Sequence, residues 1–440
     1  MTTCIIGAGC SGFTTAKRLR DHGLPFDIYE KSDRIGGNWA YRNPNGMSAC
    51  YQSLHIDTSK WRLQFEDFPV PDGWPDFPHH SLIDGYFNAY VDHFGLRPLI
   101  RFNTSVERCE QRGDGRWDVT LSTGETKTYD TIVVANGHHW SPNVPQYPGS
   151  FGGVQLHAHD YRTPFDPVDM RGKNIVVVGL GNSAVDIASE LSQRPIAKNL
   201  WVAARRGVWV LPKYFNGQPS DKTPLPTWMP GWMKRKLAAW AVKRTVGSMS
   251  AYGLPEPDHK PLEAHPTVSG EFLLRCGSGD IKVKPNIAEL MGRQVRFTDG
   301  SVEDVDVIVY ATGYKVSFPF LSDEAAPVRD NHLPLFKRMV QADPRLHSLW
   351  FMGLAQSLPT LVNLAEQQSK LLAAWLTGTY ALPSPDEMRE AIVRDERLHR
   401  GHYYASSRHT MQLDFDVYVR DLQRELKAGA GRAKKVPQAA

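Results

Sequence analysis

Cysteine is scarce in this sequence, and its few copies are not grouped. The cysteines of the 440-residue chain form neither a CxxC pair nor a zinc-ligand spacing: Cys4, Cys10, Cys50, Cys109 and Cys276. Because a CxxC pair is the redox centre of dithiol oxidoreductases, its absence argues against a disulfide reductase. Scattered thiols are typical of a reducing compartment, and the sequence predicts no metal site.

Long apolar runs and a strong excess of one charge are also missing. No apolar segment approaches the length of a membrane span, and the first predicted strand begins almost at Met1, so we expect no signal peptide. The formal net charge of +4 is too small to indicate a nucleic-acid partner. The sequence therefore predicts a cytoplasmic protein without nucleic acid.

Glycine, in contrast, is plentiful, and it recurs at close spacing in two turns, GAGCSG at residues 7–12 and GLGNSA at residues 179–184. Each turn follows a hydrophobic run and precedes an apolar-periodic stretch that predicts a helix. Small residues let backbone amides approach a pyrophosphate, and the N-terminus of the following helix stabilises its charge. We therefore predict an α/β fold with two Rossmann-like dinucleotide-binding domains. The residues expected along the two dinucleotides are Gly7, Gly9, Cys10, Ser11 and Gly12, and Gly179, Gly181, Asn182, Ser183 and Ala184.

The residues that follow the two turns differ, and the difference predicts the ligands. A strand at residues 26–29 ends in Glu30, about 20 residues past the first glycines, where a carboxylate accepts hydrogen bonds from ribose hydroxyls. This suits FAD. A strand at residues 200–204 ends in Arg205 and Arg206, and guanidinium groups there favour the 2′-phosphate of NADPH. A solvated basic turn is the alternative interpretation of the arginine pair.

The domain organisation follows from a second internal similarity. Residues 130–137 and 306–313 share an acid, a buried strand and a terminal glycine, as expected for the last strand of each nucleotide domain. We therefore predict that one domain is inserted into the other, with C-terminal helices at the end. The predicted parts are a discontinuous FAD-binding domain (1–170 and 305–427), an NADP-binding domain (171–304) and a disordered tail (428–440).

The segment between the turns carries a recognisable signature. In FGGVQLHAHDY, the residues Phe151, Gly153, His157 and Tyr161 match the FxGxxxHxxxY pattern of flavin-containing monooxygenases, and the chain resembles that family up to about residue 378. Tyr161, where Baeyer-Villiger enzymes more often carry Trp, favours the N- and S-oxygenating branch. Further similar segments lie in family order: 51–60, 65–69, 137–139, 179–186, 283–286 and 311–315.

The resemblance implies a specific chemistry. NADPH reduces the flavin, O₂ adds to the reduced ring, and the resulting flavin C4a-hydroperoxide oxygenates a soft nitrogen or sulfur atom of a small substrate. The protein is expected to orient the cofactors and exclude water. For His157, a hydrogen-bonded structural histidine is the alternative. The residues to which the resemblance assigns roles are Asp57, Thr58, His157 and Tyr161 in catalysis, and Gly37, Asn38, Trp39, Ile56, Asp57, Thr58, Val185, Asp186, Thr312 and Gln356 in cofactor binding.

One residue departs from the family pattern. Asp57 stands where the family usually carries asparagine, whose amide both donates and accepts, whereas a carboxylate only accepts unless it is protonated. We expect either that the pKa of Asp57 is raised, so that it can donate, or that the protein leaks hydrogen peroxide. A surface aspartate that caps a turn with Thr58 and Ser59 is the alternative.

Several alternatives stay open from the sequence. The rival functions are a Baeyer-Villiger monooxygenase acting on ketones and a non-catalytic NADPH-binding sensor. In the Trp- and Lys-rich segment 227–249, Trp228, Trp232 and Trp240 would share a helical face, and we favour packing or a dimer contact over a membrane-interfacial helix. Substrate identity and oligomeric state, a homodimer included, are not determined.

Overall fold

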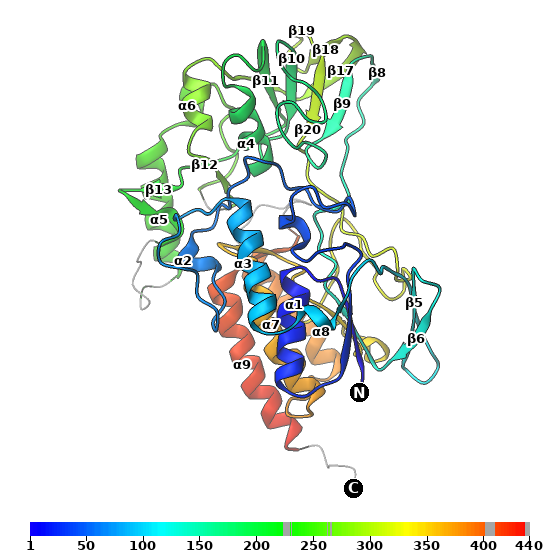
Figure 1. Cartoon of the computed structure of the whole chain (residues 1–440). Coiled ribbons are helices and arrows are strands. Elements are labelled where there is room, and N and C mark those ends of the chain that lie inside the picture. The colour runs from blue at the N-terminus through cyan, green and yellow to red at the C-terminus, as the bar shows by residue number, and fades with distance from the viewer. Residues whose placement is uncertain (223–228, 230, 262, 265, 401–409, 436–440) are drawn as a thin grey trace. The chain divides into compact units, whose positions relative to one another are not determined.

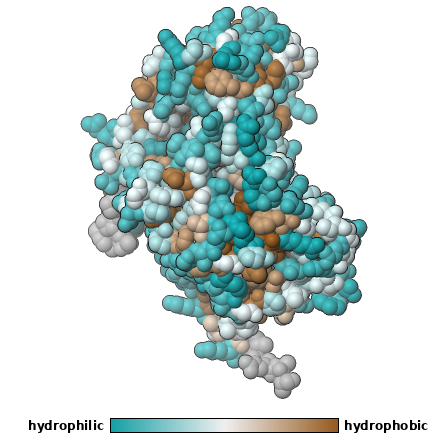
Figure 2. All heavy atoms as spheres, viewed as in Figure 1, coloured by the Kyte–Doolittle hydropathy of each residue, from teal (hydrophilic) through white to brown (hydrophobic). Residues whose placement is uncertain are grey.

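The chain divides into two compact units in the computed structural model, which describes residues 1–222, 229, 231–261, 263–264, 266–400 and 410–435 (Figure 1). Unit 1 comprises residues 1–48, 60–138 and 316–440, and unit 2 comprises residues 49–59 and 139–315. One glycine turn lies in each unit. The face seen in Figure 2 is covered mainly by hydrophilic residues, with apolar residues in small groups.

Unit 1 is built around a parallel five-stranded sheet with the order β21-β7-β1-β2-β3. Every residue of β1 and β7 is buried, which explains why these strands form continuous apolar runs rather than alternating patterns. The strands are β1 (Thr3–Ile6), β2 (Phe26–Tyr29), β3 (Ile100–Arg101), β7 (Thr131–Val134) and β21 (Leu349–Phe351). Outside this sheet lie the antiparallel β4 (Val106–Gln111), β5 (Trp117–Leu121) and β6 (Thr126–Tyr129), and the pair β22 (Gln356–Leu358) and β23 (Gln412–Asp414).

The helices of unit 1 pack into its core, as α1 illustrates. Phe13 of α1 meets Phe65, Phe87 and Tyr90 with ring centroids 5.9, 5.3 and 5.2 Å away, which anchors α1 in an aromatic cluster. The helices are α1 (Cys10–Asp21), α2 (Lys60–Leu63), α3 (His80–His93), α7 (Leu364–Leu376), α8 (Pro385–Arg400) and α9 (Phe415–Ala433), with 3₁₀ turns η1 (Gly37–Trp39), η2 (Arg97–Leu99) and η5 (Pro344–Leu346).

The C-terminal segment differs from the prediction. Residues 428–433 were predicted to be disordered, but they form the last turns of α9, so this part of the prediction is wrong. The helix buries Tyr418, Leu422 and Gly429, and a Cβ at Gly429 would lie 2.0 Å from the Tyr380 ring, so the end of the helix is packed closely. Residues 436–440 lie outside the described residues.

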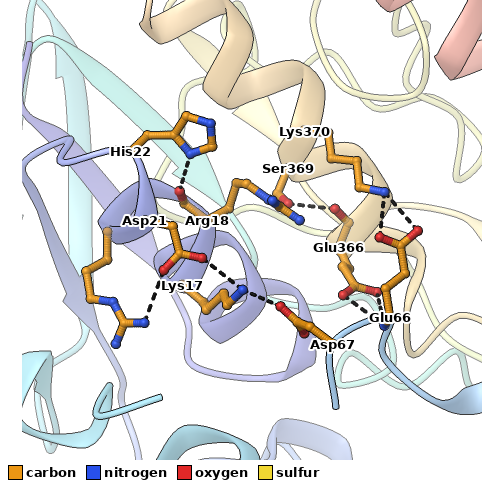
Figure 3. A network of polar contacts seen from close by, with 10 residues as sticks. Lys17, Arg18, Asp21, His22, Glu66, Asp67, Glu366, Ser369 and Lys370 are labelled. Atoms are coloured by element: carbon orange, nitrogen blue, oxygen red, sulfur yellow. Dashed lines mark hydrogen bonds and ion pairs between the residues drawn. The ribbon is translucent and has the colours of Figure 1, made fainter. Parts of the chain in front are cut away.

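A polar network connects the loop after α2 to α1 and α7 (Figure 3). The backbone N–H of Glu66 donates to both carboxylate oxygens of Glu366, at 3.1 and 3.2 Å, and Lys370 Nζ lies 2.7 Å from Glu66 Oε2. Lys17 of α1 pairs with Asp67. Glu366 is only 3% exposed, and its burial, with smaller contributions from Glu66 and Asp67, raises its pKa to about 7.

Unit 2 repeats the plan with a parallel sheet in the order β16-β11-β10-β20-β9. Alternate residues of β10 face two cores: Val177 lies in one cluster and Val176 in the other. The strands are β9 (Val154–His157), β10 (Asn174–Val178), β11 (Asn199–Ala204), β16 (Lys282–Pro285) and β20 (Val307–Tyr310).

The remaining elements of unit 2 surround this sheet. A four-stranded sheet has the order β19-β18-β17-β8, from β8 (Gly149–Phe151), β17 (Ile287–Gly292), β18 (Gln294–Phe297) and β19 (Val302–Asp304). The short pairs are β12 (Val210–Leu211) with β15 (Thr267–Val268), and β13 (Tyr214–Phe215) with β14 (Gln218–Pro219). The helices are α4 (Asn182–Leu191), α5 (Gly231–Val246) and α6 (Phe272–Gly277), with η3 (Ser220–Lys222) and η4 (Met249–Tyr252).

The borders of the units differ from the predicted domain boundaries at residues 170 and 304. Strand β20 pairs with both β10 and β9, so residues predicted for the first domain on either side of the insertion lie in the sheet of unit 2. Residues 49–59 also belong to unit 2. The sequence pattern identifies strands, but it does not reveal which sheet an edge strand joins.

Helix α5 covers most of the described part of the Trp- and Lys-rich segment. Its residues Val242 and Val246 lie in the core of unit 2, as expected for a packed helix. Leu237 and Trp240 are 43% and 63% exposed, whereas Trp228 lies outside the described residues. None of the described helices combines the length and apolar composition that a bilayer crossing requires.

Candidate cofactor and active site

The first glycine turn allows no side chain at two of its positions. Gly7 has a φ of +100°, and a Cβ there would lie 2.7 Å from the carbonyl oxygen of Ala135. A Cβ at Gly12 would lie 1.8 Å from the carbonyl oxygen of Gly7. Strand β1, the turn and the start of α1 therefore pack backbone against backbone, which is the close approach that a dinucleotide fold requires.

Helix α1 begins without a side-chain cap. Its N-cap is Gly9, so no side chain accepts a hydrogen bond from the amides of the first turn. A Cβ at Gly37 of η1 would lie 3.4 Å from Gly9 Cα, so η1 and the turn are neighbours. Uncapped amides at a helix N-terminus, next to backbone without side chains, fit a pyrophosphate.

Glu30 is fixed at the carboxyl end of β2. Its oxygens accept hydrogen bonds from the backbone N–H groups of Ala8 at 2.7 Å and Ser32 at 2.8 Å. Burial raises the pKa of Glu30, and these two hydrogen bonds oppose the rise. The carboxylate therefore lies beside the turn, at the position predicted for ribose recognition.

The second turn repeats this geometry in unit 2. Gly179 has a φ of +121°, and a Cβ there would lie 2.5 Å from the carbonyl oxygen of Ala311. Helix α4 has Gly181 as its N-cap and also lacks a side-chain cap. Asn182 Oδ1 accepts a hydrogen bond from the N–H of Val268 at 3.0 Å. This turn therefore fits a second pyrophosphate by the same physical test.

The arginine pair follows β11, next to the second turn. Arg205 and Arg206 are both exposed, and Arg206 Nε lies 3.6 Å from Asp258 Oδ2. A carboxylate at that distance is a weak, solvent-screened partner. The guanidinium groups thus lie at the strand end where a 2′-phosphate is recognised in this type of fold.

The FxGxxxHxxxY segment packs within unit 2. A Cβ at Gly153 would lie 2.5 Å from the carbonyl oxygen of Asp306, which accounts for the glycine. His157 Nδ1 accepts a hydrogen bond from the N–H of His159 at 3.0 Å, and burial lowers the pKa of His157 to about 4. Both the structural interpretation and the catalytic role of His157 stay predictions.

Residues 56–58 belong to unit 2. Ile56 and Thr58 are buried, and the side chain of Asp57 is 25% exposed, with its Oδ1 lying 3.3 Å from Lys213 Nζ. Desolvation raises the pKa of Asp57 to about 7; Lys213 opposes this rise and Asp186 adds to it. Asp57 is thus a largely buried, ion-paired carboxyl group. Its raised pKa agrees with the expectation that it can be protonated and donate, rather than with a solvated turn cap.

Two more carboxyl groups lie on α4, one turn apart. Asp186 accepts a hydrogen bond from Tyr51 at 2.8 Å, and Glu190 accepts one from Tyr161 at 2.7 Å. The two tyrosine rings meet edge to face with centroids 6.1 Å apart. Burial raises the pKa of both acids. Sequence reasoning missed Glu190 and Tyr51, although two acids four residues apart after a phosphate turn are a detectable signal.

Further predicted residues lie elsewhere in the two units. Thr312 Oγ1 donates to the carbonyl of Asn143 at 2.5 Å in unit 2, and Gln356 pairs with Gln412 across β22 and β23 in unit 1. Sequence reasoning also missed Gly353, where a Cβ would lie 2.2 Å from Ser11 Oγ.

The predicted residues form two sets. Those in unit 1 are Gly7, Gly9, Cys10, Ser11, Gly12, Glu30, Gly37, Asn38, Trp39 and Gln356. Those in unit 2 are Ile56, Asp57, Thr58, His157, Tyr161, Gly179, Gly181, Asn182, Ser183, Ala184, Val185, Asp186, Arg205, Arg206 and Thr312. Among the described residues, no group of three or more His, Cys, Asp and Glu side chains is arranged to hold a metal ion.

Known proteins are similar to this chain in sequence and in fold. The flavin-binding monooxygenase-like family matches residues 2–431. Flavin-containing monooxygenase 5 of Oryctolagus cuniculus is 34% identical over 433 residues, covering 93% of this chain and 80% of that protein. N-oxide-forming dimethylaniline monooxygenase 2 of Rattus norvegicus is 34% identical over 445 residues, covering 96% and 82%. The solved S-allyl-L-cysteine S-oxygenase of Allium sativum is 25% identical with a TM-score of 0.69, covering 100% of this chain and 94% of that one.

Such matches extend over nearly the whole chain. They confirm the predicted α/β fold class with two dinucleotide-binding domains, the assignment to the NADPH-dependent oxidoreductases, and the cofactors FAD and NADPH. The chain belongs to the family of flavin-containing monooxygenases.

Proposed function

We propose that the protein uses NADPH and O₂ to oxygenate soft nitrogen or sulfur atoms of small organic substrates. The observation that carries the proposal is the pair of uncapped glycine turns, one in each unit. Glu30 follows the first turn and the arginine pair follows the second. The two turns thus suit two different dinucleotides.

The proposal assigns FAD to unit 1 and NADPH to unit 2. The turn at residues 7–12 binds one pyrophosphate and Glu30 the ribose, while the turn at residues 179–184 binds the other and Arg205 and Arg206 its 2′-phosphate. When bound, FAD supplies the ring that takes hydride from NADPH and activates O₂. The residues around Asp57 hold protons and exclude water.

The names of two relatives support nitrogen and sulfur as the atoms oxidised. One relative is an N-oxide-forming dimethylaniline monooxygenase, and one solved structure is an S-oxygenase. A tertiary amine and a thioether are both soft nucleophiles, so one enzyme can act on either. A ketone instead requires a nucleophilic attack by the activated oxygen. A ketone substrate therefore distinguishes the Baeyer-Villiger alternative from N- or S-oxygenation.

A substrate panel tests the proposal. Purified protein is supplied with NADPH and a tertiary amine, a thioether or a ketone, and the oxygenated product is quantified by mass spectrometry. We expect flavin absorbance that bleaches faster with NADPH than with NADH, and N-oxide or sulfoxide formation. Ester formation from the ketone alone would favour the Baeyer-Villiger alternative, and protein that binds NADPH without flavin would favour the sensor.

The proposal extends to the compartment and the assembly. All five cysteines lie in the described part of the chain and none of them forms a disulfide, which supports a reducing compartment and hence the cytoplasm. Cell fractionation tests the location. The homodimer stays a prediction from the sequence, and light scattering of the purified protein measures it.

A further inference from the structure

Lys213 places a positive charge next to Asp57. It lies between β12 and β13, its side chain is 19% exposed, and its Nζ is 3.3 Å from Asp57 Oδ1. Asp57 comes from the segment 49–59, so the pair joins two parts of unit 2 that are far apart in sequence. A cation that is four-fifths buried loses hydration, and an anionic partner compensates that loss.

The surroundings of the pair are acidic. Asp186 acts on Asp57 through its charge, and Tyr51 donates its hydroxyl to Asp186. Glu271 raises the pKa of Asp186 whereas His55 lowers it, and Glu190 lies one turn further along α4. Lys213 opposes this accumulation of negative charge at both Asp57 and Asp186.

We propose that Lys213 is a positioning residue for Asp57: the ammonium donates next to the carboxylate acceptor, so that the pair supplies the donor and the acceptor that a carboxamide at position 57 would supply. The proposal rests on the proposed function for its catalytic meaning. The ion pair itself does not depend on that function.

The pair keeps a donor available over a wide pH range. When Asp57 is protonated, its own O–H donates; when Asp57 is ionised, the Lys213 ammonium donates beside it. Without Lys213, the ionised form of Asp57 has an acceptor but loses this donor. Removal of an opposite charge at this distance is also expected to raise the pKa of Asp57 by about one to three units.

The first test measures thermal unfolding against pH, without turnover. The folded-state pKa of Asp57 is about 7, above its unfolded value, so its contribution to stability is present at low pH and is lost as pH rises through about 7. The Tm difference between wild type and Asp57→Asn should therefore change up to about pH 7. The difference between Lys213→Met and Asp57→Asn/Lys213→Met should continue to change to a pH about one to three units higher.

Two variants control this measurement. Lys213→Arg keeps the positive charge, so the Tm difference that Asp57 causes should change up to the same pH as in wild type. Lys198→Met removes an exposed lysine of unit 2 and should also leave this pH unchanged. If the Tm difference that Asp57 causes changed only up to the same pH in Lys213→Met as in wild type, the proposal would be overturned. This result would stand whether or not the protein oxygenates amines or thioethers, so it separates failure of the inference from failure of the proposed function.

The second test measures hydrogen peroxide released per NADPH consumed between pH 6 and pH 10. We expect a flat profile for wild type and for Asp57→Asn, since both keep a donor. In Lys213→Met, we expect about tenfold more peroxide once the pH exceeds the raised pKa of Asp57, because one charge-assisted hydrogen bond is then lost. Lys213→Met in the Asp57→Asn background should be flat again. A flat profile for Lys213→Met alone, or a leak that persists in the double variant, would contradict the positioning role.

Discussion

Four adjacent strands of the two parallel sheets follow the same chain order, but the fifth strand at one edge does not: β21 is the last strand of its sheet along the chain, whereas β9 is the first strand of its sheet. In unit 1 the order is β21-β7-β1-β2-β3, and in unit 2 it is β9-β20-β10-β11-β16. The first glycine of each turn meets the carbonyl that follows the equivalent strand, Ala135 for Gly7 and Ala311 for Gly179. The two units differ in the residue that follows the next strand after the turn: Glu30 follows β2, and Arg205 follows β11. Common backbone geometry thus suits the shared pyrophosphate, and we propose that this one side-chain position distinguishes the nucleotides.

A second difference lies inside the turns. Gly12 has no room for a Cβ. Ala184 carries one at the equivalent position of the second turn and is fully buried. The first turn is therefore the tighter of the two. This comparison makes opposite substitutions in the two turns informative.

The largest expected effect comes from Gly12→Ala. The new Cβ would lie 1.8 Å from the carbonyl oxygen of Gly7, and a backbone atom cannot rotate away as a flexible side chain can. Even ordinary overpacking costs about 1–3 kcal/mol, so we expect a loss of about 3 kcal/mol or more in stability and loss of flavin from the purified protein. The reverse substitution, Ala184→Gly, should cost only about 1 kcal/mol. Equal effects on Tm and flavin content would contradict the difference between the turns.

The next effect compares two buried acids, Glu366 in unit 1 and Asp57 in unit 2. Both have a pKa raised to about 7 by burial, but Glu366 accepts from a backbone N–H while Asp57 pairs with Lys213. Because the folded pKa of Glu366 exceeds its unfolded value, stability is lost as pH rises towards and through about 7. Glu366→Gln should therefore be more stable than wild type at pH 8, by up to about 3 kcal/mol, and similar to it at pH 4.

The Tm of Glu366→Gln, measured from pH 4 to pH 8, checks this expectation. Glu390→Gln, which changes an exposed acid on α8, is the matched control and should follow wild type throughout. A Glu366→Gln curve parallel to wild type at all pH values would mean that the acid is ionised without cost in the folded protein.

A smaller effect tests the side chains that we propose distinguish the nucleotides. The double variant Arg205→Ala/Arg206→Ala should raise the KM for NADPH about tenfold or more, because charge-assisted hydrogen bonds to the 2′-phosphate are lost. The KM for NADH should change much less, since NADH lacks that phosphate. Steady-state kinetics with both nucleotides measure the ratio. An unchanged KM for both nucleotides would support the interpretation of the pair as a solvated basic turn.

The elements with strong local signals were predictable from the sequence. Strands β1, β7, β10 and β20 are short buried apolar runs, and the glycine turns follow two of them directly. The sheet to which β9 and β20 belong depends on pairing between distant segments, so the predicted domain boundaries differed from the units. The Asp57–Lys213 pair joins residues from separate loops, and no local pattern connects them. The residues in the terminal turns of α9 are mostly small or basic. Because such a composition shows no apolar face, the packing of these turns against Tyr380 could not be predicted.

Unit 2 is not a contiguous piece of chain, and this has a practical consequence for dissecting the protein. Tyr51 comes from the segment 49–59, yet it lies in the hydrophobic cluster of unit 2 and donates to Asp186. A fragment expressed from residues 139–315 would lack this ring and would leave a hole in its interior beside Tyr161. Residues 49–59 must therefore be grafted onto such a fragment, through an engineered linker, for the nucleotide-binding properties of that half to be studied in isolation.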